Sequence, residues 1–423
     1  MLNRFKILLL VALVALAQST NGELTAAKRK PYVSVSAGSF DRRETVVSFA
    51  LPPKPKGNVY DARDAYDLHD AWALRDASGR LIPLQIDPNR RATFVLPALR
   101  AGQTKTYDLV AATAKAKPEV DFKYRSDAVD FKIRGRSVFS FVTFPAGLPS
   151  RDIKPIFLRG GYIHPVLTPS GRLVTDDYPS DHYHHHGIWF AWTKTEFEGA
   201  HPDFWNVGDG TGKVELVALN RPWGGPVHGG FESRQLYFAL TGAARKAALN
   251  EDWDVRLYNV GQGGNDGKRY FLFDIVATQQ CMTKSPLVLE EYRYGGMGVR
   301  GHRNWKDKSK VSFLTSEGKA REDGNATRGR WVRMSGLVDG EMVGIAVLDH
   351  PSNFRSPQPL RLHPDDPYFN YAPSQLGRFE IKPGERFVLR YRYVVADGSA
   401  DKAELDRLWN DYATPPQVSV ELK

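Results

Sequence analysis

The chain has 423 residues, of which 25% are charged and 42% hydrophobic, and its formal net charge is +10 at pH 7. That length has room for two domains with buried cores. The only cysteine, Cys281, excludes an internal disulfide, and we expect it to be a buried structural thiol rather than a nucleophile. Lysines and arginines are dispersed without a nucleic-acid-binding motif, so we expect no nucleic-acid partner. We interpret the positive surplus as a soluble surface, with a groove for anionic partners such as acidic polysaccharide as the alternative.

The first 17 residues have the pattern of a secretory signal peptide. Basic Arg4 and Lys6 precede an apolar run over residues 7–16, and Ala15-Leu16-Ala17 matches a cleavage site. No later segment approaches the roughly 20 apolar residues that a transmembrane helix needs. We therefore expect an exported protein, periplasmic or extracellular, without a membrane span.

Residues 30–115 are predicted to form a small β-sandwich domain. Short strand-like segments alternate there with turns rich in Pro, Gly and Asp, a spacing typical of such sandwiches. The segments are 33–35, 44–49, 71–74, 92–96 and 105–109. Residues 110–119, rich in Ala and Lys, resemble a linker.

Residues 122–415 repeat this pattern on a larger scale. Long β-type runs occupy 138–144, 236–240, 253–258, 271–277, 343–348 and 386–395. Only 401–412 has the apolar spacing of a helix. The sequence contains no internal repeat of 20 to 50 residues, which argues against a propeller or solenoid. We therefore predict an all-β protein in which a large antiparallel β-sandwich carries the site and follows the small one.

The most informative segment runs from Asp181 to Trp189, because it holds four of the 11 histidines within residues 182–186. If this segment is extended, His182, His184 and His186 share one face, while Tyr183 and His185 share the other. Imidazole is both a common metal ligand and a proton-transfer group near neutral pH. A histidine-rich solvated turn is the simpler interpretation.

Three chemistries fit this segment. A divalent metal, zinc or calcium, would take two or three of its ligands from His164, His182, His184 and His186, with a carboxylate as a further ligand. A metal-free lyase or isomerase would use a histidine as base, an arginine against a carboxylate, and a tyrosine or second histidine as acid. A glycosidase would need two facing carboxylates, for which the sequence offers Glu290, Glu291, Asp181 and Asp349 without supporting spacing. A histidine cluster without catalytic function is the fourth reading.

A later loop supplies candidate substrate-binding groups, since loops on a rigid sheet commonly carry sites. The candidates are Arg293, Arg300, Arg303, Asn304 and Trp305. His302 and His350 are further catalytic candidates beside His184 and His186. Aromatic and planar polar side chains suit sugars, although Trp189, Trp192, Trp205 and Trp305 are individually more typical of a core. We expect His69, His201, His228 and His363 to lie outside the site.

The glycine-rich loop at 205–212 lacks the strand-loop-helix context of a phosphate-binding loop, so we expect no nucleotide cofactor. Over about residues 130–415 the chain resembles the exported bacterial domain family labelled "methane oxygenase PmoA-like". The residues that carry the resemblance run from His164-Pro165 to Gly187-Ile188-Trp189 and include Gly208-Asp209-Gly210 and Asp349-His350-Pro351. The label itself is misleading, because a genuine methane monooxygenase subunit has many membrane spans. The resemblance implies a galactose-mutarotase-like supersandwich, similar to sandwiches that act on carbohydrate.

Two functional hypotheses follow from the sequence. The first is an exported carbohydrate-active enzyme, a lyase or hydrolase for glycosides or acidic polysaccharide. The second is a carbohydrate-binding or scaffold protein without catalytic activity, whose histidines are separated or packed in apolar surroundings. The substrate, the metal and the oligomeric state are not determined by the sequence.

Overall fold

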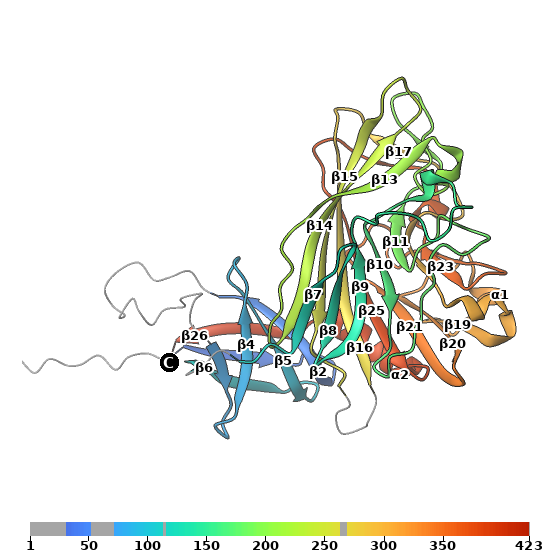
Figure 1. Cartoon of the computed structure of the whole chain (residues 1–423). Coiled ribbons are helices and arrows are strands. Elements are labelled where there is room, and N and C mark those ends of the chain that lie inside the picture. The colour runs from blue at the N-terminus through green and yellow to red at the C-terminus, as the bar shows by residue number, and fades with distance from the viewer. Residues whose placement is uncertain (1–30, 52–71, 113–115, 263–268, 423) are drawn as a thin grey trace, which may run out of the picture.

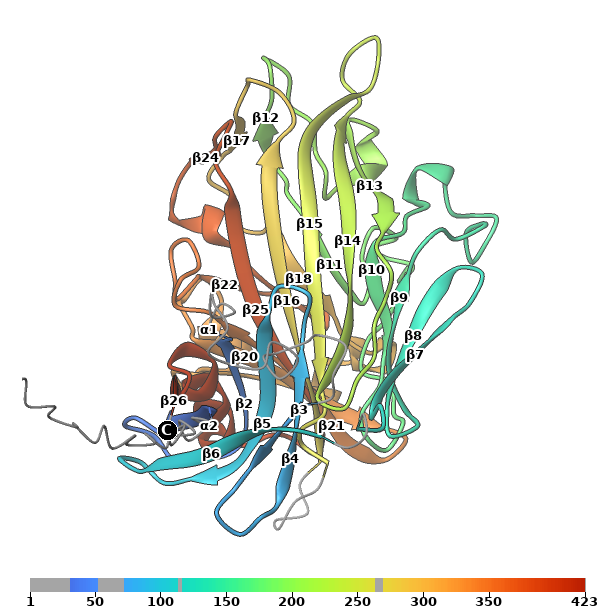
Figure 2. The same ribbon diagram turned by 90° about the vertical axis from the view of Figure 1, so that its left-hand side faces the viewer.

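The computed structural model describes residues 31–51, 72–112, 116–262 and 269–422. The expected signal peptide, residues 1–17, and His69 lie outside these residues. The described chain is mostly β, with 51% strand and 9% helix, and its sheets are antiparallel. Two layers of long strands form the larger part of the molecule, and a small curved sheet lies at one end of them (Figures 1 and 2). The all-β prediction is confirmed.

The small sheet contains all five strands expected in the first domain. In spatial order its strands are β2 (Arg42–Ala50), β5 (Arg91–Leu99), β4 (Leu81–Ile86), β3 (Trp72–Arg75), β6 (Thr104–Ala111), β1 (Pro31–Ser36) and β26 (Gln417–Leu422). Strand β4 was missed because Pro83 interrupts its pattern, yet Pro83 pairs with Ala73. Strand β26 lies outside the range 30–115 expected for this unit, because the chain returns to pair with β1.

The two large layers are eight-stranded sheets, which we call the site sheet and the long sheet. The site sheet consists of β22 (Leu360–Leu362), β23 (Tyr368–Tyr371), β18 (Gly296–Arg300), β11 (Ile188–Ala191), β10 (Tyr162–Val166), β9 (Arg136–Val142), β8 (Ala128–Ile133) and β7 (Val120–Tyr124). The long sheet consists of β13 (Gly212–Leu219), β14 (His228–Ala239), β15 (Lys246–Tyr258), β16 (Tyr270–Cys281), β25 (Phe387–Asp397), β21 (Glu341–Asp349), β20 (Trp331–Val338) and β19 (Val311–Thr315).

Shorter elements connect these sheets. They are the three-stranded sheet β12 (Thr195–Glu196), β17 (Leu287–Leu289) and β24 (Phe379–Ile381); the helices α1 (Arg321–Gly324) and α2 (Lys402–Ala413); and the single-turn helices η1 (Pro155–Phe157), η2 (Val207–Asp209), η3 (Arg303–Lys306), η4 (Lys308–Lys310) and η5 (Pro373–Leu376). Helix α2 matches the predicted helix closely, and the Asp401 side chain caps its first turn by accepting from the Glu404 N–H. No helix in the described ranges is long and apolar enough to span a bilayer.

The main core lies between the site sheet and the long sheet. Alternate residues of facing strands meet there, as in the contact of Phe139 with Phe273 at 5.0 Å between ring centroids. A second apolar cluster lies on the outer face of the long sheet, where Leu405 and Leu408 of α2 pack against strand residues such as Leu272. Buried Arg42 of the small sheet binds Asp411 of α2 at 2.9 Å. Helix α2 therefore links the small sheet to the long sheet.

Strand alternation in the site sheet positions the candidate site. Ile163 of β10 pairs with Ile188 of β11, and both side chains belong to the main core. Because successive side chains alternate, Tyr162 and His164 point to the opposite face, where Tyr162 is also buried and belongs to the same apolar cluster. That face carries the loop between β10 and β11, which contains the histidine-rich segment.

Candidate functional site

The histidine-rich segment consists of turns and is not extended. The His182 N–H donates to the Pro179 carbonyl at 2.9 Å, and the His185 N–H donates to the His182 carbonyl at 2.8 Å. The second turn brings His182 and His185 together as a parallel stack, with ring centroids 4.6 Å apart and an interplanar angle of 9°. The alternation expected for an extended segment is therefore wrong, because these turns place residues three apart on the same side.

At the end of the segment, His186 is hydrogen-bonded to a carboxylate. Its Nδ1 lies 2.6 Å from Asp177 Oδ1, and the Tyr162 hydroxyl donates to the other carboxylate oxygen at 2.8 Å. The Tyr162 ring stacks on the imidazole at 4.3 Å, and Tyr178 contacts it edge-on at 4.8 Å. His186 is 1% exposed. Asp177 and the two tyrosines thus hold the imidazole in one orientation.

Electrostatics determine the protonation of this pair. Burial lowers the pKa of His186, although the charge and hydrogen bond of Asp177 oppose that effect. Burial alone would raise the pKa of Asp177, but His186 and Tyr162 outweigh it, and the pKa stays below its ordinary value. At neutral pH the carboxylate is ionised and the imidazole neutral. The ring proton therefore lies on Nδ1, toward Asp177, and Nε2 is left as a proton acceptor.

Gly187 allows β10 to approach the segment closely. A Cβ at this position would lie 2.3 Å from the Ile163 carbonyl oxygen and 3.0 Å from the His164 Cβ, so a larger residue requires the strands to separate. His164 is half-buried, and its Nδ1 lies 2.9 Å from the Thr175 hydroxyl. Burial lowers the pKa of His164, and the charges of Asp177 and Asp176 oppose that effect.

His184 and His186 line one small pocket. Its volume of about 10 Å³ corresponds to a single water molecule. Arg159, Trp205 and Lys213 also line it. Burial, followed by the charge of His182, lowers the pKa of His184 to about 3, so this imidazole is neutral at pH 7. The pocket therefore presents two neutral imidazoles to the same small space.

His182 lies in a different group, with His363 and Asp366. Each of these three residues has one potential metal-ligand atom that lies within 4.8 Å of the other two. The Nδ1 of His182 is buried without a hydrogen-bond partner. In the described ranges this is the only such group of three, and it does not include His164, His184 or His186. The structure thus brings His182 together with His363 and Asp366, although the His182 ring also contacts that of His184 at 5.6 Å.

Two cations already neutralise the carboxylates of this group. The Lys306 ammonium bonds to both Asp181 and Asp366. The buried Arg300 guanidinium lies 3.3 Å from Asp181 and 3.9 Å from Asp366. A divalent ion would have to displace the ammonium and would face the guanidinium. The donor set suits zinc, but the positive charges oppose it.

Arg303 and His302 contact a third part of the segment. Arg303, on η3, bonds to buried Asp176 at 2.8 Å. Burial lowers the pKa of His302, while Asp176 opposes that effect, and its Nδ1 accepts from the Asn304 N–H at 3.2 Å. His164 is also within the field of Asp176. The structure therefore brings His302 and Arg303 to the same cluster as His164.

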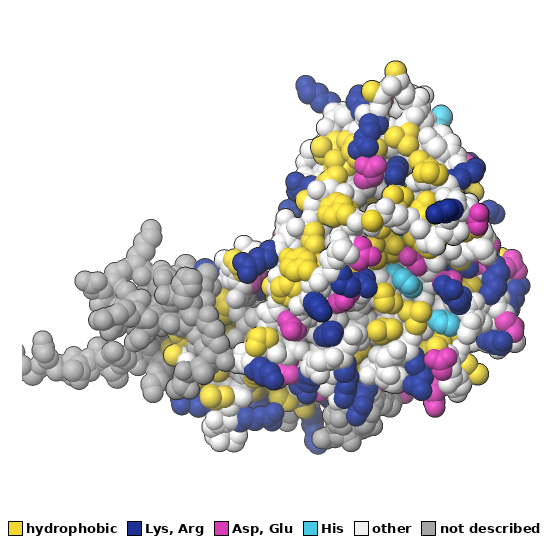
Figure 3. Space-filling view, in the orientation of Figure 1, with side chains coloured by type: hydrophobic (Ala, Val, Ile, Leu, Met, Phe, Trp, Pro, Cys, Tyr) yellow, Lys and Arg dark blue, Asp and Glu magenta, His cyan; other side chains and the backbone are white. Residues whose placement is uncertain are grey.

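We call the set formed by these contacts the histidine cluster. It consists of His164, Asp176, Asp177, His182, His184, His185, His186, Arg300, His302, Arg303, Lys306, His363 and Asp366. Histidines reach the surface among acidic and basic side chains on the face shown in Figure 3. His363 was expected to lie outside the site, and no local sequence signal marks it, because 177 residues (363 − 186) separate it from the segment.

Other candidates lie elsewhere or have other contacts. Trp305 is fully buried, and its indole N–H donates to the Leu337 carbonyl at 3.1 Å, which favours a core residue over a sugar-stacking surface. Trp189, Trp192 and Trp205 are also buried. His350 contacts Ser352 and the Tyr412 ring of α2, neither of which touches the histidine cluster. Arg293 is exposed and lies over tyrosine rings.

The remaining expectations concern carboxylates and cysteine. Buried Asp349 accepts hydrogen bonds from Asn353 and Ser356, while Glu290 pairs with Arg378 at 3.4 Å. Among the described residues, no two of the four candidate glycosidase carboxylates, Glu290, Glu291, Asp181 and Asp349, form a contact with each other or share a bonding partner. Cys281 is half-buried, with Sγ 3.0 Å from the Ile381 carbonyl oxygen, and burial raises the pKa of its thiol, as expected for a structural cysteine.

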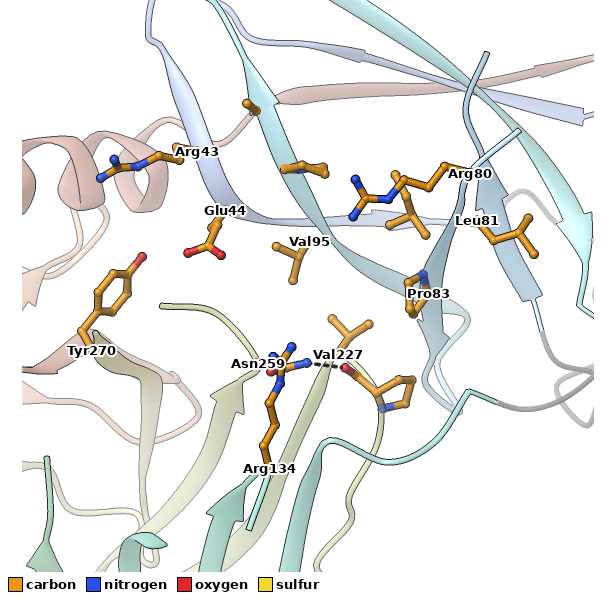
Figure 4. Close-up of a pocket in the computed structure, with 14 residues that line it drawn as sticks. Arg43, Glu44, Arg80, Leu81, Pro83, Val95, Arg134, Val227, Asn259 and Tyr270 are labelled. Atoms are coloured by element: carbon orange, nitrogen blue, oxygen red, sulfur yellow. Dashed lines mark hydrogen bonds between the residues drawn. The ribbon is translucent and has the colours of Figure 1, made fainter. Parts of the chain in front are cut away.

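A larger cavity of about 660 Å³ lies between the small sheet and the long sheet (Figure 4). Arg43, Arg80, Arg134 and Glu44 surround it. Two of these arginines already have carboxylate partners, since Arg43 pairs with Glu404 and Arg134 with Glu119. No histidine lines this cavity, so it lacks the proton-transfer groups of the histidine cluster.

Residues 128–410 match DUF6807, a family of unknown function, over more than half of the chain. The chain belongs to the DUF6807 family. The DUF6807 region begins with β8 and ends within α2, so it includes every residue of the histidine cluster. Strands β1 to β6 of the small sheet lie outside it. No curated protein matched the chain.

Proposed function

We propose that this protein is an exported carbohydrate-active enzyme, a hydrolase or lyase for glycosides or acidic polysaccharide, and that the histidine cluster is its site. The observation that carries the proposal is the buried Asp177–His186 pair, whose imidazole lines a water-sized pocket together with His184. A carboxylate that fixes one ring nitrogen leaves the other to exchange a proton in a defined direction.

His186 acts as the general base in this proposal. In hydrolysis, Nε2 takes a proton from the pocket water while the water oxygen bonds to the sugar carbon, and the leaving oxygen regains that proton as its bond to carbon breaks. In a lyase, Nε2 takes the proton from carbon beside a carboxylate and a C=C bond forms. The neighbouring C–O bond breaks with its electron pair on oxygen, and that oxygen takes the proton back from the imidazolium. Asp177 stabilises the imidazolium in both reactions.

Family resemblance supports the substrate class. The exported bacterial family labelled "methane oxygenase PmoA-like" is similar to large sandwiches that act on carbohydrate, and the two-layer fold with a small sheet at one end is compatible with that comparison. The signal-peptide pattern in residues 1–17 supports export to the periplasm or the medium.

A metal-dependent form of the same site is the second candidate. It is favoured by the Nδ1 of His182, which has no hydrogen bond and lies 3.4 Å from Asp181 and 3.7 Å from Asp366. Zinc or calcium would bind His182, His363 and Asp366, and Lys306 would have to leave Asp366. Elemental analysis of protein purified without chelator tests this form. Stoichiometric metal that is lost in a His182→Ala, His363→Ala double variant supports it, and metal-free active protein excludes it.

An activity screen tests the proposal. The panel contains neutral glycosides, oxidised keto-sugars and uronate polymers, each with and without chelator. On any substrate turned over, we expect His186→Gln to lose about 100-fold to 10,000-fold in kcat. The matched control is His201→Gln, because His201 is exposed and outside the cluster.

Equal turnover by wild type and His186→Gln would refute the assigned base. Sugar binding without turnover of any panel member would favour the carbohydrate-binding or scaffold alternative. That alternative also predicts that the His186→Gln variant binds sugar as tightly as the wild type.

A further inference from the structure

Arg293 and Arg361 lie on neighbouring segments near the histidine cluster, because the Gln375 side-chain amide donates both to the Arg293 carbonyl at 2.9 Å and to the carbonyl of Leu360, beside Arg361, at 3.3 Å. Arg293 follows β17, and its guanidinium lies 5.7 Å from the ring centroids of both Tyr292 and Tyr294. Arg361 belongs to β22, and its pKa is lowered by burial, with a further lowering by the charge of Arg293. We call Tyr292, Arg293, Tyr294 and Arg361 the arginine–tyrosine surface.

The positive charge of this surface is uncompensated within the described part of the chain. Arg361 Nη1 donates to the neutral Asn325 side chain at 3.2 Å, and its Nε is buried without a partner. Neither Arg293 nor Arg361 forms an ion pair with a described carboxylate, in contrast to Arg300, which lies 3.3 Å from Asp181. Two guanidinium groups that repel each other stabilise the fold poorly, so an anion would relieve this repulsion.

Aromatic contacts connect this surface to the histidine cluster. The ring of Tyr294 lies 5.5 Å from that of Trp205, which lies 5.9 Å from His185. The Tyr294 hydroxyl also accepts from the Asn206 side-chain amide at 3.1 Å. On the other side, Tyr368 lies 5.6 Å from His363. These rings, of which those of Trp205 and Tyr368 are buried, place the arginine–tyrosine surface next to the histidine cluster within the fold.

We propose that the arginine–tyrosine surface is a subsite for the carboxylate of an acidic sugar, so that the substrate is a uronate-containing saccharide. The planar forks of Arg293 and Arg361 match the planar carboxylate, and the half-exposed Tyr292 and Tyr294, which hold the Arg293 guanidinium against their rings, border the subsite. This inference rests on the proposed function for its place beside a reacting site. Binding to the surface itself requires no turnover.

Calorimetric titration of the full chain tests the subsite. The probes are an oligogalacturonate, a neutral oligosaccharide of the same length and a sulfated one. We expect the wild type to bind the uronate probe at least tenfold more tightly than the neutral probe, and Arg293→Gln with Arg361→Gln to remove that preference. Arg361→Lys should retain only part of it, because an ammonium keeps the charge but lacks the fork.

Arg234→Gln is the control for loss of positive charge, because Arg234 lies on the long sheet and pairs with Asp252 at 2.7 Å. It should leave the uronate preference unchanged. Thermal unfolding establishes that each variant is folded. An equal affinity of the wild type for the uronate and neutral probes would overturn the proposal. So would a preference that survives both substitutions, or an arginine-dependent preference for the sulfated probe alone.

The outcomes separate this inference from the proposed function. If uronate binding depends on Arg293 and Arg361 while no panel substrate is turned over, the subsite stands and the enzymatic function falls. If His186-dependent turnover is found without an arginine-dependent uronate preference, the enzymatic function stands and the subsite falls.

Discussion

The protonation of His186 can be tested without a substrate by the substitution Asp177→Asn. In the wild type, the carboxylate accepts from His186 Nδ1 at 2.6 Å and from the Tyr162 hydroxyl at 2.8 Å. An asparagine has one acceptor oxygen and one donor amide. If the oxygen stays with Tyr162, the amide faces His186 Nδ1, and the ring proton must move to Nε2. The variant should therefore convert the proton acceptor Nε2 into a donor.

The cost in stability follows from the two hydrogen bonds. Each bond to a charged acceptor contributes about 1.5 to 3 kcal/mol, and a neutral bond contributes about 1 kcal/mol. Exchanging two charged bonds for two neutral ones should lower the free energy of unfolding by about 1 to 4 kcal/mol. The Asp177 side chain is only 17% exposed, so water screens these bonds little.

Long-range nitrogen–proton NMR spectra of protein labelled with nitrogen-15 in its histidines measure the tautomer. The His186 signal is identified as the one that disappears from the spectrum of the His186→Gln variant. Urea denaturation measures the stability. Asp252→Asn is the control, because its partner Arg234 is 55% exposed, and such surface pairs contribute about 1 kcal/mol or less. The reasoning is refuted if Asp177→Asn keeps the proton on Nδ1 and unfolds like the control.

Three further predictions concern buried groups. Burial lowers the pKa of His228 to about 3, so between pH 6.5 and pH 3 the unfolded chain binds a proton that the folded chain does not. Between pH 7 and pH 4 the free energy of unfolding of the wild type should therefore fall by about 3 kcal/mol more than that of His228→Gln. Equal falls in denaturant titrations would contradict this. Gly187→Ala should cost about 1 to 3 kcal/mol in urea denaturation, because its Cβ would lie 2.3 Å from the Ile163 carbonyl oxygen, whereas Gly147→Ala, with nothing within 4 Å, should cost almost nothing. Trp305→Ala should cost about 3 to 5 kcal/mol, and a loss of sugar affinity at unchanged stability would instead support a stacking platform.

Strand alternation predicted much of the fold because it depends on local sequence. The segment 253–258 lies within β15, where buried and less buried residues alternate over most of the strand. The segment 386–395 lies largely within β25, where residues 391–396 are all buried. Strand β26 could not be predicted as part of the small sheet, because its pairing with β1 depends on how the whole chain closes. The two-layer arrangement was predictable as a class, but the strand order was not.

The candidate site was predicted only in part, because local sequence revealed one of its segments but not the partners that come from distant segments. Imidazoles adjacent in sequence identified the histidine-rich segment, but their orientations depend on turns that no alternation pattern reveals. The partners that decide the chemistry come from other elements: Tyr162 from β10, and His363 and Asp366 from the segment between β22 and β23. The expectation of a metal bound by two or three of His164, His182, His184 and His186 did not include His363, and it did not anticipate the Asp177 carboxylate that bonds to His186.

The return of β26 to the small sheet has a consequence for synthesis. Until residues 417–422 leave the ribosome, β1 has a free edge with unpaired N–H and C=O groups. Such an edge can recruit strands of other chains, so the nascent protein should depend on a chaperone until its last residues arrive. In the complete sheet the edge strand on that side is β26 instead. A chain truncated before Gln417 would make β1 the edge, beside its buried Val33 and Val35, and should aggregate more readily than the full chain.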